Sequence, residues 1–396
     1  MNKKALILTP ILPYPPDDGS RLRPYQIIKA FYKFVDVDLI SFYLPYEDIN
    51  SAKEFYRNYC KNLYFLQQKE NKISLIKFCM YYSHKENKEQ INKIIQENDY
   101  NLIIVEKIIM LSYLKKNIFK NYKVVIDSWG IDSEILRQLY INEKKLFKKF
   151  ILFIKYLRHL LCEICFLSRC KYLVAITDKQ LNFYKKFFKR KKLFLIPNFV
   201  DMDYFKAAYE SFEEKCIVFT GIMNFIPNID AVIFFVNEIM PKLKEKINVK
   251  FYIIGKNPTK EVSKLQNNFD IVVTGEVKDV REYISKAEVV VVPLRMGSGL
   301  RNKVLQAMAC SKTVVATKEA IEGINVQDKE NILIANTQQE FVEKILLVLN
   351  NRELNLKIAK NARKFIEENF SEKIIVKKWI NMYEEILNNN NNRRQA

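Results

Sequence analysis

Residues 288–323 decide the fold, and they read EVVVVPLRMGSGLRNKVLQAMACSKTVVATKEAIEG. The four valines at 289–292 predict a buried parallel strand. Pro293 ends this strand, because proline has no N–H to donate to the neighbouring strand. A turn with glycines at 297 and 299 follows, and the apolar residues from 300 to 308 have helical spacing. The stretch therefore predicts a strand, a glycine-rich turn and a helix, which is the basic unit of an α/β protein.

The turn in this stretch has the features of an anion site. A helix start offers free N–H groups and the positive end of the helix dipole. Arg301 and Lys303 fall in the first turn of that helix. Cations are unfavourable there unless a bound anion neutralises them. We predict that Gly297, Ser298 and Gly299 hold a phosphate or diphosphate together with these two cations. The alternative is a tight connection whose cations are only solvated.

Length and charge narrow the class of protein. The 396 residues suggest two or three domains, and 65 Lys and Arg against 45 Asp and Glu give a net charge of +20. Such a charge favours nucleic acid, an anionic membrane face or phosphorylated substrates, although a general drift toward lysine gives the same number. The seven cysteines, an odd count, suggest reduced thiols in a cytoplasmic protein, and no uncharged apolar run reaches about 18 residues. Cys162, Cys165 and Cys170 favour packing over metal binding, so no metal site is predicted.

Strand-like and helix-like segments alternate along the whole chain, which predicts parallel sheets in two doubly wound domains. The polar residues 206–215 are the expected linker between the domains. The expected strands are residues 5–9, 35–42, 63–66, 102–105, 124–126, 172–176 and 193–196 in the first half, and 216–220, 249–254, 271–274, 289–292, 313–316 and 331–334 in the second.

Two loops of the first half are candidate ligand loops, because they follow strands at the edge where such sheets bind ligands. Gly19 and Ser20 end the loop after the first strand and open a helix. Asp127 and Asp132 follow the strand at 124–126, and a carboxylate there could orient a sugar hydroxyl or act as a base. The plainer alternatives are an ordinary loop and a helix N-cap.

A long helical segment at 143–169 has apolar residues spaced for one face and lysines over much of the remainder. This pattern is compatible with an anionic membrane surface. Since amphipathic stripes usually face a core, we expect packing here more than membrane contact.

Glycines gather in the second half. Five of the eight glycines, namely Gly221, Gly255, Gly275, Gly297 and Gly299, follow expected strands. Glycine at the carboxyl end of a strand lets the backbone approach a ligand closely. The pattern predicts a ligand edge on the second sheet.

Several stretches together resemble the GT-B glycosyltransferases of the family-4, or group 1, type over essentially the whole chain, and most of all the branch that makes bacterial surface polysaccharides. The final helix, 370–387, is similar to the crossover helix by which this fold returns to its first domain. The matching stretches are residues 13–19 (PYPPDDG), 198–201 (NFVD) with Tyr204 and Phe205, 219–223 (FTGIM) with 227–231 (PNIDA), 254–258 (IGKNP) and 297–303 (GSGLRNK).

The resemblance implies two facing Rossmann-like domains: residues 1–205 for the acceptor, 206–370 for the nucleotide-sugar donor, and 371–387 as the crossover helix. Residues 388–396 have no apolar residue except Ala396, which predicts a disordered tail. The resemblance also implies a retaining transfer from a nucleoside-diphosphate sugar with no required metal or cofactor. Arg301 and Lys303 would neutralise the leaving diphosphate, and Asp127 or Asp132 would face the acceptor. The implied donor-binding residues are Gly19, Ser20, Gly221, Asn224, Gly255, Gly275, Glu276, Val277, Gly297, Ser298, Gly299 and Gln306.

Some positions depart from the family pattern. Gln306 stands where the second of a pair of glutamates is usual, and no glutamate occupies the first position. The Arg and Lys pair usual after the second domain's first strand is missing from 221–228. His84 and His159 lie in helical segments, so the family's first-domain histidine has no obvious counterpart.

The implied acceptor is lipid-linked or polysaccharide, and the implied location is cytoplasmic, with peripheral contact at the inner face of the plasma membrane as an option. The alternatives are a catalytically degenerate GT-B binding or regulatory subunit and, less favoured, a nucleotide-sugar epimerase. No nucleic-acid-binding signature is present, so we expect no nucleic-acid partner.

Overall fold

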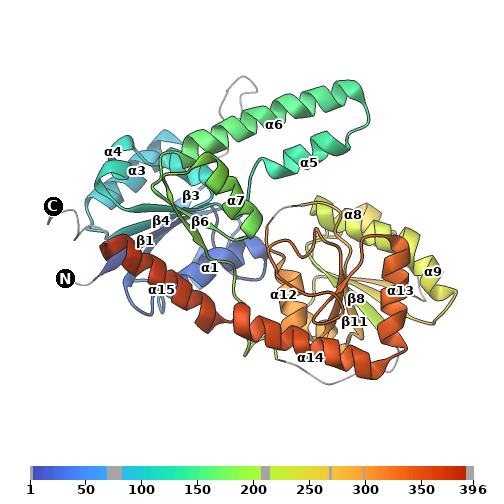
Figure 1. Cartoon of the computed structure of the whole chain (residues 1–396). Coiled ribbons are helices and arrows are strands. Elements are labelled where there is room, and N and C mark those ends of the chain that lie inside the picture. Colours follow the sequence, from blue (N-terminus) through green and yellow to red (C-terminus); the bar gives the residue numbers. More distant parts are fainter. Residues whose placement is uncertain (1–2, 69–82, 207–214, 267–269, 298, 389–396) are drawn as a thin grey trace. The chain divides into compact units, whose positions relative to one another are not determined.

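The computed structural model of the chain describes residues 3–68, 83–206, 215–266, 270–297 and 299–388. They form two compact units (Figure 1). Unit 1 comprises residues 1–198 and 375–396, and unit 2 comprises residues 199–374. Each unit is built around its own parallel sheet.

The sheet of unit 1 has seven parallel strands in the order β3-β2-β1-β4-β5-β6-β7. Helices α3 and α4 lie on one side of it, and α1 and α15 lie on the other (Figure 1). The strands are β1 (Lys4–Thr9), β2 (Asp36–Tyr43), β3 (Asn62–Gln67), β4 (Leu102–Glu106), β5 (Val124–Asp127), β6 (Tyr172–Ala175) and β7 (Lys192–Leu195). The helices are α1 (Gly19–Phe31), α2 (Ile49–Tyr56), α3 (Lys85–Gln96), the 3-10 helix η1 (Ile108–Tyr113), α4 (Lys116–Asn121), α5 (Glu134–Asn142), α6 (Leu146–Leu167), α7 (Asp178–Phe187) and α15 (Glu372–Asn388).

The sheet of unit 2 has six parallel strands in the order β10-β9-β8-β11-β12-β13. The strands are β8 (Cys216–Thr220), β9 (Lys250–Ile254), β10 (Ile271–Gly275), β11 (Val289–Val292), β12 (Thr313–Ala316) and β13 (Leu333–Ile334). The helices are α8 (Ile226–Phe234), the π-helix η2 (Phe235–Ile239), α9 (Met240–Lys244), α10 (Lys260–Ser263), α11 (Val280–Lys286), α12 (Asn302–Ala309), α13 (Gln338–Leu349) and α14 (Arg352–Asn369).

The fold class predicted from the sequence is confirmed. All thirteen expected strands are present within two residues of the expected bounds, because uninterrupted runs of β-branched and aromatic residues are buried on both faces of a parallel sheet. The strand at 289–292 is fully buried, as its four valines predict. Parts of the expected linker at 206–215 and of the expected tail at 388–396 lie outside the described residues.

The last helix, α15, completes unit 1. Trp379 and Tyr383 are buried on it and pack edge-on against Phe31 of α1, with ring centroids 5.7 and 5.9 Å apart. Burial of aromatic side chains contributes strongly to core stability. The C-terminal helix is therefore part of the core of the first unit, although it is distant in sequence.

The boundary between the units lies at Asn198 and Phe199, a few residues before the expected one at 205 and 206. The segment that follows Phe199 packs on unit 2, where the guanidinium of Arg281 lies 3.7 Å from the ring centroid of Tyr204 and donates to the backbone carbonyl of the same residue. Contacts of this segment with remote helices, which its sequence does not reveal, place it in the second unit.

The hairpin of α5 and α6 differs from the sequence expectation. The apolar stripe of α6 was expected to face the core, yet most of it is exposed, and only Cys162, Glu163, Phe166 and Leu167 near its end are buried. The expectation of a packed stripe is therefore wrong for the greater part of this helix. None of the helices in the described parts of the chain is both long and apolar enough to cross a membrane.

Candidate active site

The carboxyl edge of the unit 2 sheet has a topological switch point between β8 and β11. These strands are neighbours in the sheet, but β9 and β10 follow β8 on its other side. Ligands of doubly wound sheets bind in the crevice outside such a point. Gly221 follows β8 and Gly297 and Gly299 follow β11, so the structure brings the expected phosphate turn and the first glycine to this edge.

Glycine is required where the strands of this edge end. The N–H of Gly221 donates to the carbonyl of Ile254 (2.9 Å), and the N–H of Gly255 donates to the carbonyl of Gly275 (3.0 Å). A Cβ built on Gly255 would collide with the carbonyl oxygen of Gly221, and the φ of Gly255 is +151°. The three glycines therefore form a continuous backbone edge without side chains, as the sequence predicted.

Lys303 lies on α12 and points to the end of β8. Its Nζ donates to Oδ1 of Asn228 (2.8 Å) and lies 4.0 Å from the ring centroid of Phe219. A Cβ on Gly221 would stand 2.7 Å from the same Nζ. Burial lowers the pKa of Lys303 well below its ordinary value, and the charge of Arg301 lowers it further. An anion bound here would offset that penalty.

Arg301 is the N-cap residue of α12, and burial also lowers the pKa of its guanidinium. The charge of Glu322 opposes this effect. The carboxylate of Glu322 also accepts a long hydrogen bond from the N–H of Gly299 (3.4 Å). Sequence reasoning did not single out Glu322, although its place in a Glu-Gly pair shortly after β12 was an available signal.

The remaining donor-side residues lie in loops and on α12. Asn224 is exposed in the turn before α8, Glu276 is exposed and Val277 half-buried after β10, and Gln306 is half-buried on α12. Ser298 lies outside the described residues.

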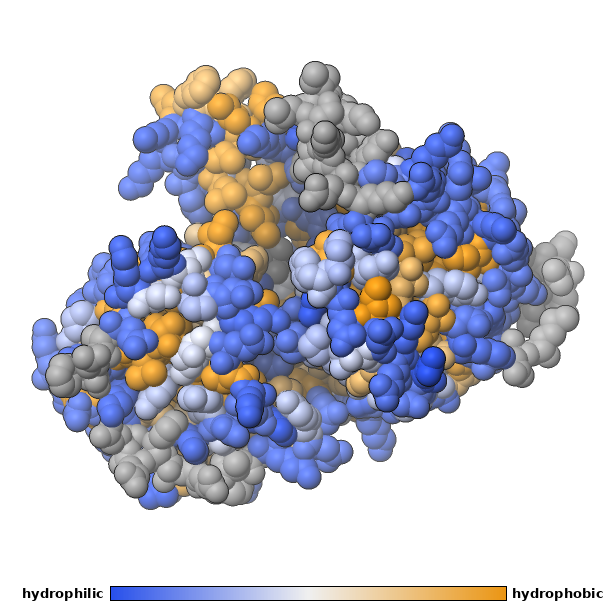
Figure 2. Space-filling model, turned by 180° about the vertical axis from the view of Figure 1, so that it is seen from behind, coloured by the Kyte–Doolittle hydropathy of each residue, from blue (hydrophilic) through white to orange (hydrophobic). Residues whose placement is uncertain are grey.

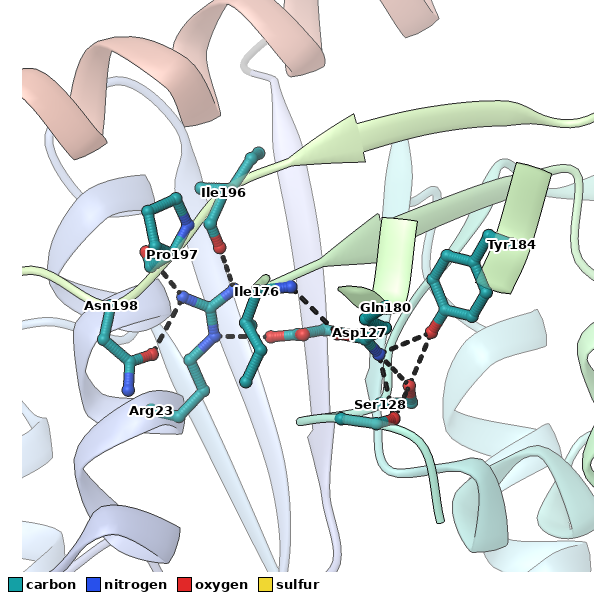
Figure 3. A network of polar contacts seen from close by, with 10 residues as sticks. Arg23, Asp127, Ser128, Ile176, Gln180, Tyr184, Ile196, Pro197 and Asn198 are labelled. Atoms are coloured by element: carbon teal, nitrogen blue, oxygen red, sulfur yellow. Dashed lines mark hydrogen bonds and ion pairs between the residues drawn. The ribbon is translucent and has the colours of Figure 1, made fainter. Parts of the chain in front are cut away.

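The corresponding edge of unit 1 contains a closed network around Arg23 (Figure 3). Nε of Arg23 donates to Oδ2 of Asp127 (2.7 Å), and its two terminal nitrogens donate to the carbonyls of Ile196 (2.8 Å) and Pro197 (2.9 Å) and to Oδ1 of Asn198 (3.1 Å). Both Arg23 and Asp127 are buried. Arg23 was not among the predicted site residues, and it joins α1, β5 and the segment that leaves β7.

A second part of this network fixes the loop after β5 (Figure 3). Nε2 of Gln180 donates to Oγ of Ser128 (2.8 Å) and to the carbonyl of Gly130 (2.9 Å), and its Oε1 accepts from the N–H of Ile176. The hydroxyls of Ser128 and Tyr184 lie 2.6 Å apart. These contacts hold Trp129, whose φ is +62°, in a backbone conformation that is uncommon for a residue with a side chain.

Glu106 ends β4 directly beside Asp127 at the end of β5. Neither carboxylate oxygen of Glu106 has a hydrogen-bond partner among the described residues. Burial, followed by the charge of Asp127, raises the pKa of Glu106 well above its ordinary value. Burial therefore favours the protonated form of Glu106, and Asp127 is the carboxylate that pairs with Arg23 (2.7 Å).

Asp132, the other predicted acid, has a different environment. Its carboxylate lies 3.5 Å from Nζ of Lys107, and 21% of its side chain is exposed. The backbone N–H groups of Asp132 and Ser133 both donate to the buried carboxylate of Glu163 on α6 (3.0 Å each). The charge of Asp132 also acts on His159 of α6, whose pKa is lowered mainly by burial.

Gly19 and Ser20 begin α1, as expected, and both are exposed. Oδ1 of the N-cap residue Asp18 accepts from the N–H of Ser20 (2.9 Å) and from that of Arg21 (3.1 Å). Among the residues that the structure describes, no group of three or more His, Cys, Asp or Glu side chains is placed to hold a metal ion.

Two doubly wound parallel sheets in one chain are the arrangement of the GT-B fold, and the predicted phosphate turn lies at the switch point of the second sheet. Residues 214–351 match the family described as Glycosyl transferases group 1. The chain therefore has the GT-B fold of solved glycosyltransferases, and residues 214–351 within its second unit match the group 1 glycosyltransferases.

Several known proteins are similar to the chain. A Klebsiella pneumoniae protein described as an uncharacterized 44.6 kDa protein in cps region is 25% identical, with 93% of this chain and 97% of that protein covered. N,N'-diacetylbacillosaminyl-diphospho-undecaprenol alpha-1,3-N-acetylgalactosaminyltransferase of Campylobacter jejuni is 29% identical over 37% of this chain and 39% of its own length. The crystal structure of Anabaena Alr3699/HepE in complex with UDP and glucose has a TM-score of 0.68 at 13% identity, covering 96% and 99% of the two chains.

Proposed function

We propose that the protein transfers a sugar, with retention at the anomeric carbon, from a nucleoside-diphosphate sugar to a lipid-linked or polysaccharide acceptor in cell-surface glycan synthesis. The observation that carries the proposal is the partly buried Lys303 at the unit 2 switch point. Lys303 has a lowered pKa and contacts an amide oxygen and an aromatic ring, and its Nζ lies 2.7 Å from where a Cβ on Gly221 would stand. Such a cation gains most from a dianionic ligand.

The chemistry follows from the position of the charges. When the bond between the anomeric carbon and the diphosphate oxygen breaks, its electron pair stays on the diphosphate. Lys303 and Arg301 stabilise that growing negative charge, and no metal is needed for this step. Because the stabilisation is larger in the transition state than in the bound substrate, it accelerates the reaction. The glycine edge at 221, 255 and 275 holds the donor, and Glu276, Val277, Asn224 and Gln306 flank it.

The acceptor side belongs to unit 1. Of the two acids predicted there, Asp132 has a partly exposed side chain, and Asp127 is buried with Arg23. We therefore assign the acceptor hydroxyl to Asp132, with Lys107 beside it, and give Asp127 a positioning role. The acceptor oxygen bonds to the anomeric carbon as its proton passes to the carboxylate of Asp132.

The relatives support the kind of pathway and acceptor. The Klebsiella relative belongs to a cps region, the Campylobacter relative is named for a diphospho-undecaprenol acceptor, and the structurally similar HepE has been solved with UDP and glucose. The net charge of +20 supports a peripheral cytoplasmic enzyme at an anionic membrane face. Nucleic acid is not proposed as a partner, because the sequence has no nucleic-acid-binding signature.

The test is a screen of UDP-, GDP-, dTDP- and CMP-sugars by thermal shift, followed by transfer assays with the nucleotide sugar that stabilises the protein. Lys303→Met should lower the transfer rate by a factor of about 100 to 1,000. Lys312→Met is the matched control, because burial also lowers the pKa of Lys312, which precedes β12 at the opposite edge of the same sheet. Equal rates for wild type and Lys303→Met would refute the proposed site.

Gln306 is the observation that favours a second candidate, a binding subunit without catalysis. A neutral amide binds a ribose hydroxyl more weakly than a carboxylate does. In that case the wild-type chain would bind the nucleotide sugar but show no turnover, and Gln306→Glu would raise donor affinity.

A further inference from the structure

The hairpin of α5 and α6 carries an exposed apolar surface. Of the 18 large apolar side chains that are exposed in the described parts of the chain, ten lie on these two helices. The three most exposed of the ten are Leu146 (85%), Phe147 (78%) and Phe150 (62%). Figure 2 shows apolar side chains gathered over this hairpin, at the upper left, with hydrophilic ones along its sides. The full set, here called the hairpin patch, is Ile135, Leu139, Ile141, Leu146, Phe147, Phe150, Ile151, Ile154, Leu157 and Leu161.

The hairpin patch follows one face of α6. Phe147, Phe150, Ile151 and Ile154 have the i, i+3, i+4, i+7 spacing of a single helical stripe, which Leu157 and Leu161 continue. A stripe of this kind normally faces a core, and here it is exposed. Contiguous exposed apolar surface of this extent marks an interaction site in a soluble protein.

The residues around the hairpin patch are predominantly basic. Residues 134–167 contain seven Lys and Arg and three acids. Each acid already has partners within unit 1: Glu134 pairs with Arg137 and Lys179, Glu143 pairs with Lys148, and Glu163 accepts the two backbone N–H groups of the loop after β5. The seven basic residues are Arg137, Lys144, Lys145, Lys148, Lys149, Lys155 and Arg158.

The hairpin is packed internally, so its exposed face is not a sign of missing structure. The ring centroid of Tyr140 on α5 lies 5.1 Å from that of Phe153 and 6.5 Å from that of Tyr156, both on α6. The end of α6 is anchored by buried Phe166 and Leu167. The aromatic contacts use one side of α6 and leave the side with Phe147 and Phe150 outward.

We propose that the hairpin patch docks on an anionic lipid surface, with the apolar stripe of α6 inserted at the boundary of headgroups and acyl chains and the lysines beside it on the headgroups. Lysines within the helix favour a helix that lies in the interface plane. A second copy of the chain is a poorer occupant, because two such hairpins would bring like charges together. The inference assigns a surface to the peripheral location proposed above, and it does not depend on the donor chemistry.

The test is co-sedimentation of the full chain with vesicles of phosphatidylcholine alone and of phosphatidylcholine with phosphatidylglycerol. We expect binding to the anionic vesicles, weakened at high salt because screening reduces the attraction to anionic lipid. Phe147→Ser/Phe150→Ser should reduce the partition coefficient by about tenfold or more, since two apolar side chains no longer leave water. Leu356→Ser is the matched control, because Leu356 is also exposed (56%) but lies on α14.

Charge and fold are controlled separately. Lys155→Gln/Arg158→Gln should weaken binding to anionic vesicles, and Lys357→Gln/Lys360→Gln, on exposed positions of α14, should not. Transfer to a water-soluble acceptor should be unchanged in Phe147→Ser/Phe150→Ser, which separates this inference from the proposed enzyme. Unchanged vesicle binding in that variant would overturn the inference. Equal binding of the wild type to neutral and anionic vesicles would also overturn it. So would a wild-type chain that binds no vesicles and is a dimer by light scattering, if Phe147→Ser/Phe150→Ser makes it a monomer.

Discussion

The two sheets of the protein place a cation at their carboxyl edges in different ways. In unit 1, Arg23 is surrounded by acceptors: one carboxylate, two backbone carbonyls and an amide oxygen. In unit 2, Nζ of Lys303 contacts a neutral amide oxygen and the face of Phe219, with no carboxylate among its partners in the described part of the chain. Arg23 has a complete set of hydrogen-bond partners, so it stabilises the fold. Lys303 lacks an anionic partner, so a ligand that carries a negative charge can supply one.

The largest predicted effect is the loss of stability on substitution of Arg23. Arg23→Met leaves the buried carboxylate of Asp127 without its cation and four accepting atoms without donors. We expect the free energy of unfolding to fall by about 3–5 kcal/mol, measured by urea denaturation.

The double variant Arg23→Met/Asp127→Asn removes the stranded charge and should recover part of this loss. If Arg23→Met lowered the free energy of unfolding by less than about 1 kcal/mol, the contribution of Arg23 would be that of an exposed ion pair. This result would contradict a structural role for Arg23.

Substitution of Lys303, in contrast to that of Arg23, should change ligand binding and not the free energy of unfolding. Since its pKa is lowered in the free protein, binding a diphosphate requires the lysine to take up a proton above that pKa. Donor affinity should therefore fall as pH rises, and calorimetry in buffers of different ionisation enthalpy should show proton uptake. Lys303→Met should lose about 100-fold in affinity, equivalent to about 2.7 kcal/mol.

The stability of the ligand-free protein provides the contrast. The unfolded chain binds the Lys303 proton up to about pH 10.5 and the folded chain releases it earlier, so stability rises with pH in this window. Lys303→Met should remove this slope without destabilising the fold. Affinity that is independent of pH in the wild type would contradict the assignment of Lys303.

The sequence reveals one of these sites better than the other. The strands, the glycines at 221, 255 and 275, and the cations at 301 and 303 could be predicted, because each follows from local spacing along the chain. Arg23 could not, since its partners lie 104 or more residues away and Pro197 and Ile196 contribute only backbone carbonyls. Periodicity also identified the stripe of α6 but not its exposure, because a pattern shows which face is apolar and not what covers it.

A glycine substitution tests how closely the edge fits Lys303. A methyl group on Gly221 would stand 2.7 Å from Nζ of Lys303 and from Nδ2 of Asn228, so Gly221→Ala should push the lysine from its position. We expect kcat/KM to fall by about tenfold, equivalent to about 1.4 kcal/mol, with a change of less than about 1 kcal/mol in the free energy of unfolding. If Gly221→Ala had the kinetics of the wild type, the function of Lys303 would not depend on its position beside Gly221.

The last prediction concerns Glu106, the second carboxyl group beside Arg23. Burial, followed by the charge of Asp127, raises the pKa of Glu106 in the folded chain, so the folded chain holds this proton to a higher pH than the unfolded chain, which loses it near pH 4.5. Glu106 therefore makes the free energy of unfolding fall as pH rises above about 4.5, up to the raised pKa. Gln has nearly the same shape and cannot ionise, so the free energy of unfolding of Glu106→Gln should be close to that of wild type at pH 5 and exceed it at pH 8, measured by urea denaturation. A loss of more than about 2 kcal/mol at both pH values would mean that Glu106 is ionised and shares Arg23 with Asp127. In that case the unit 1 edge would contain two carboxylates for one guanidinium, and its description as a closed, neutralised site would fail.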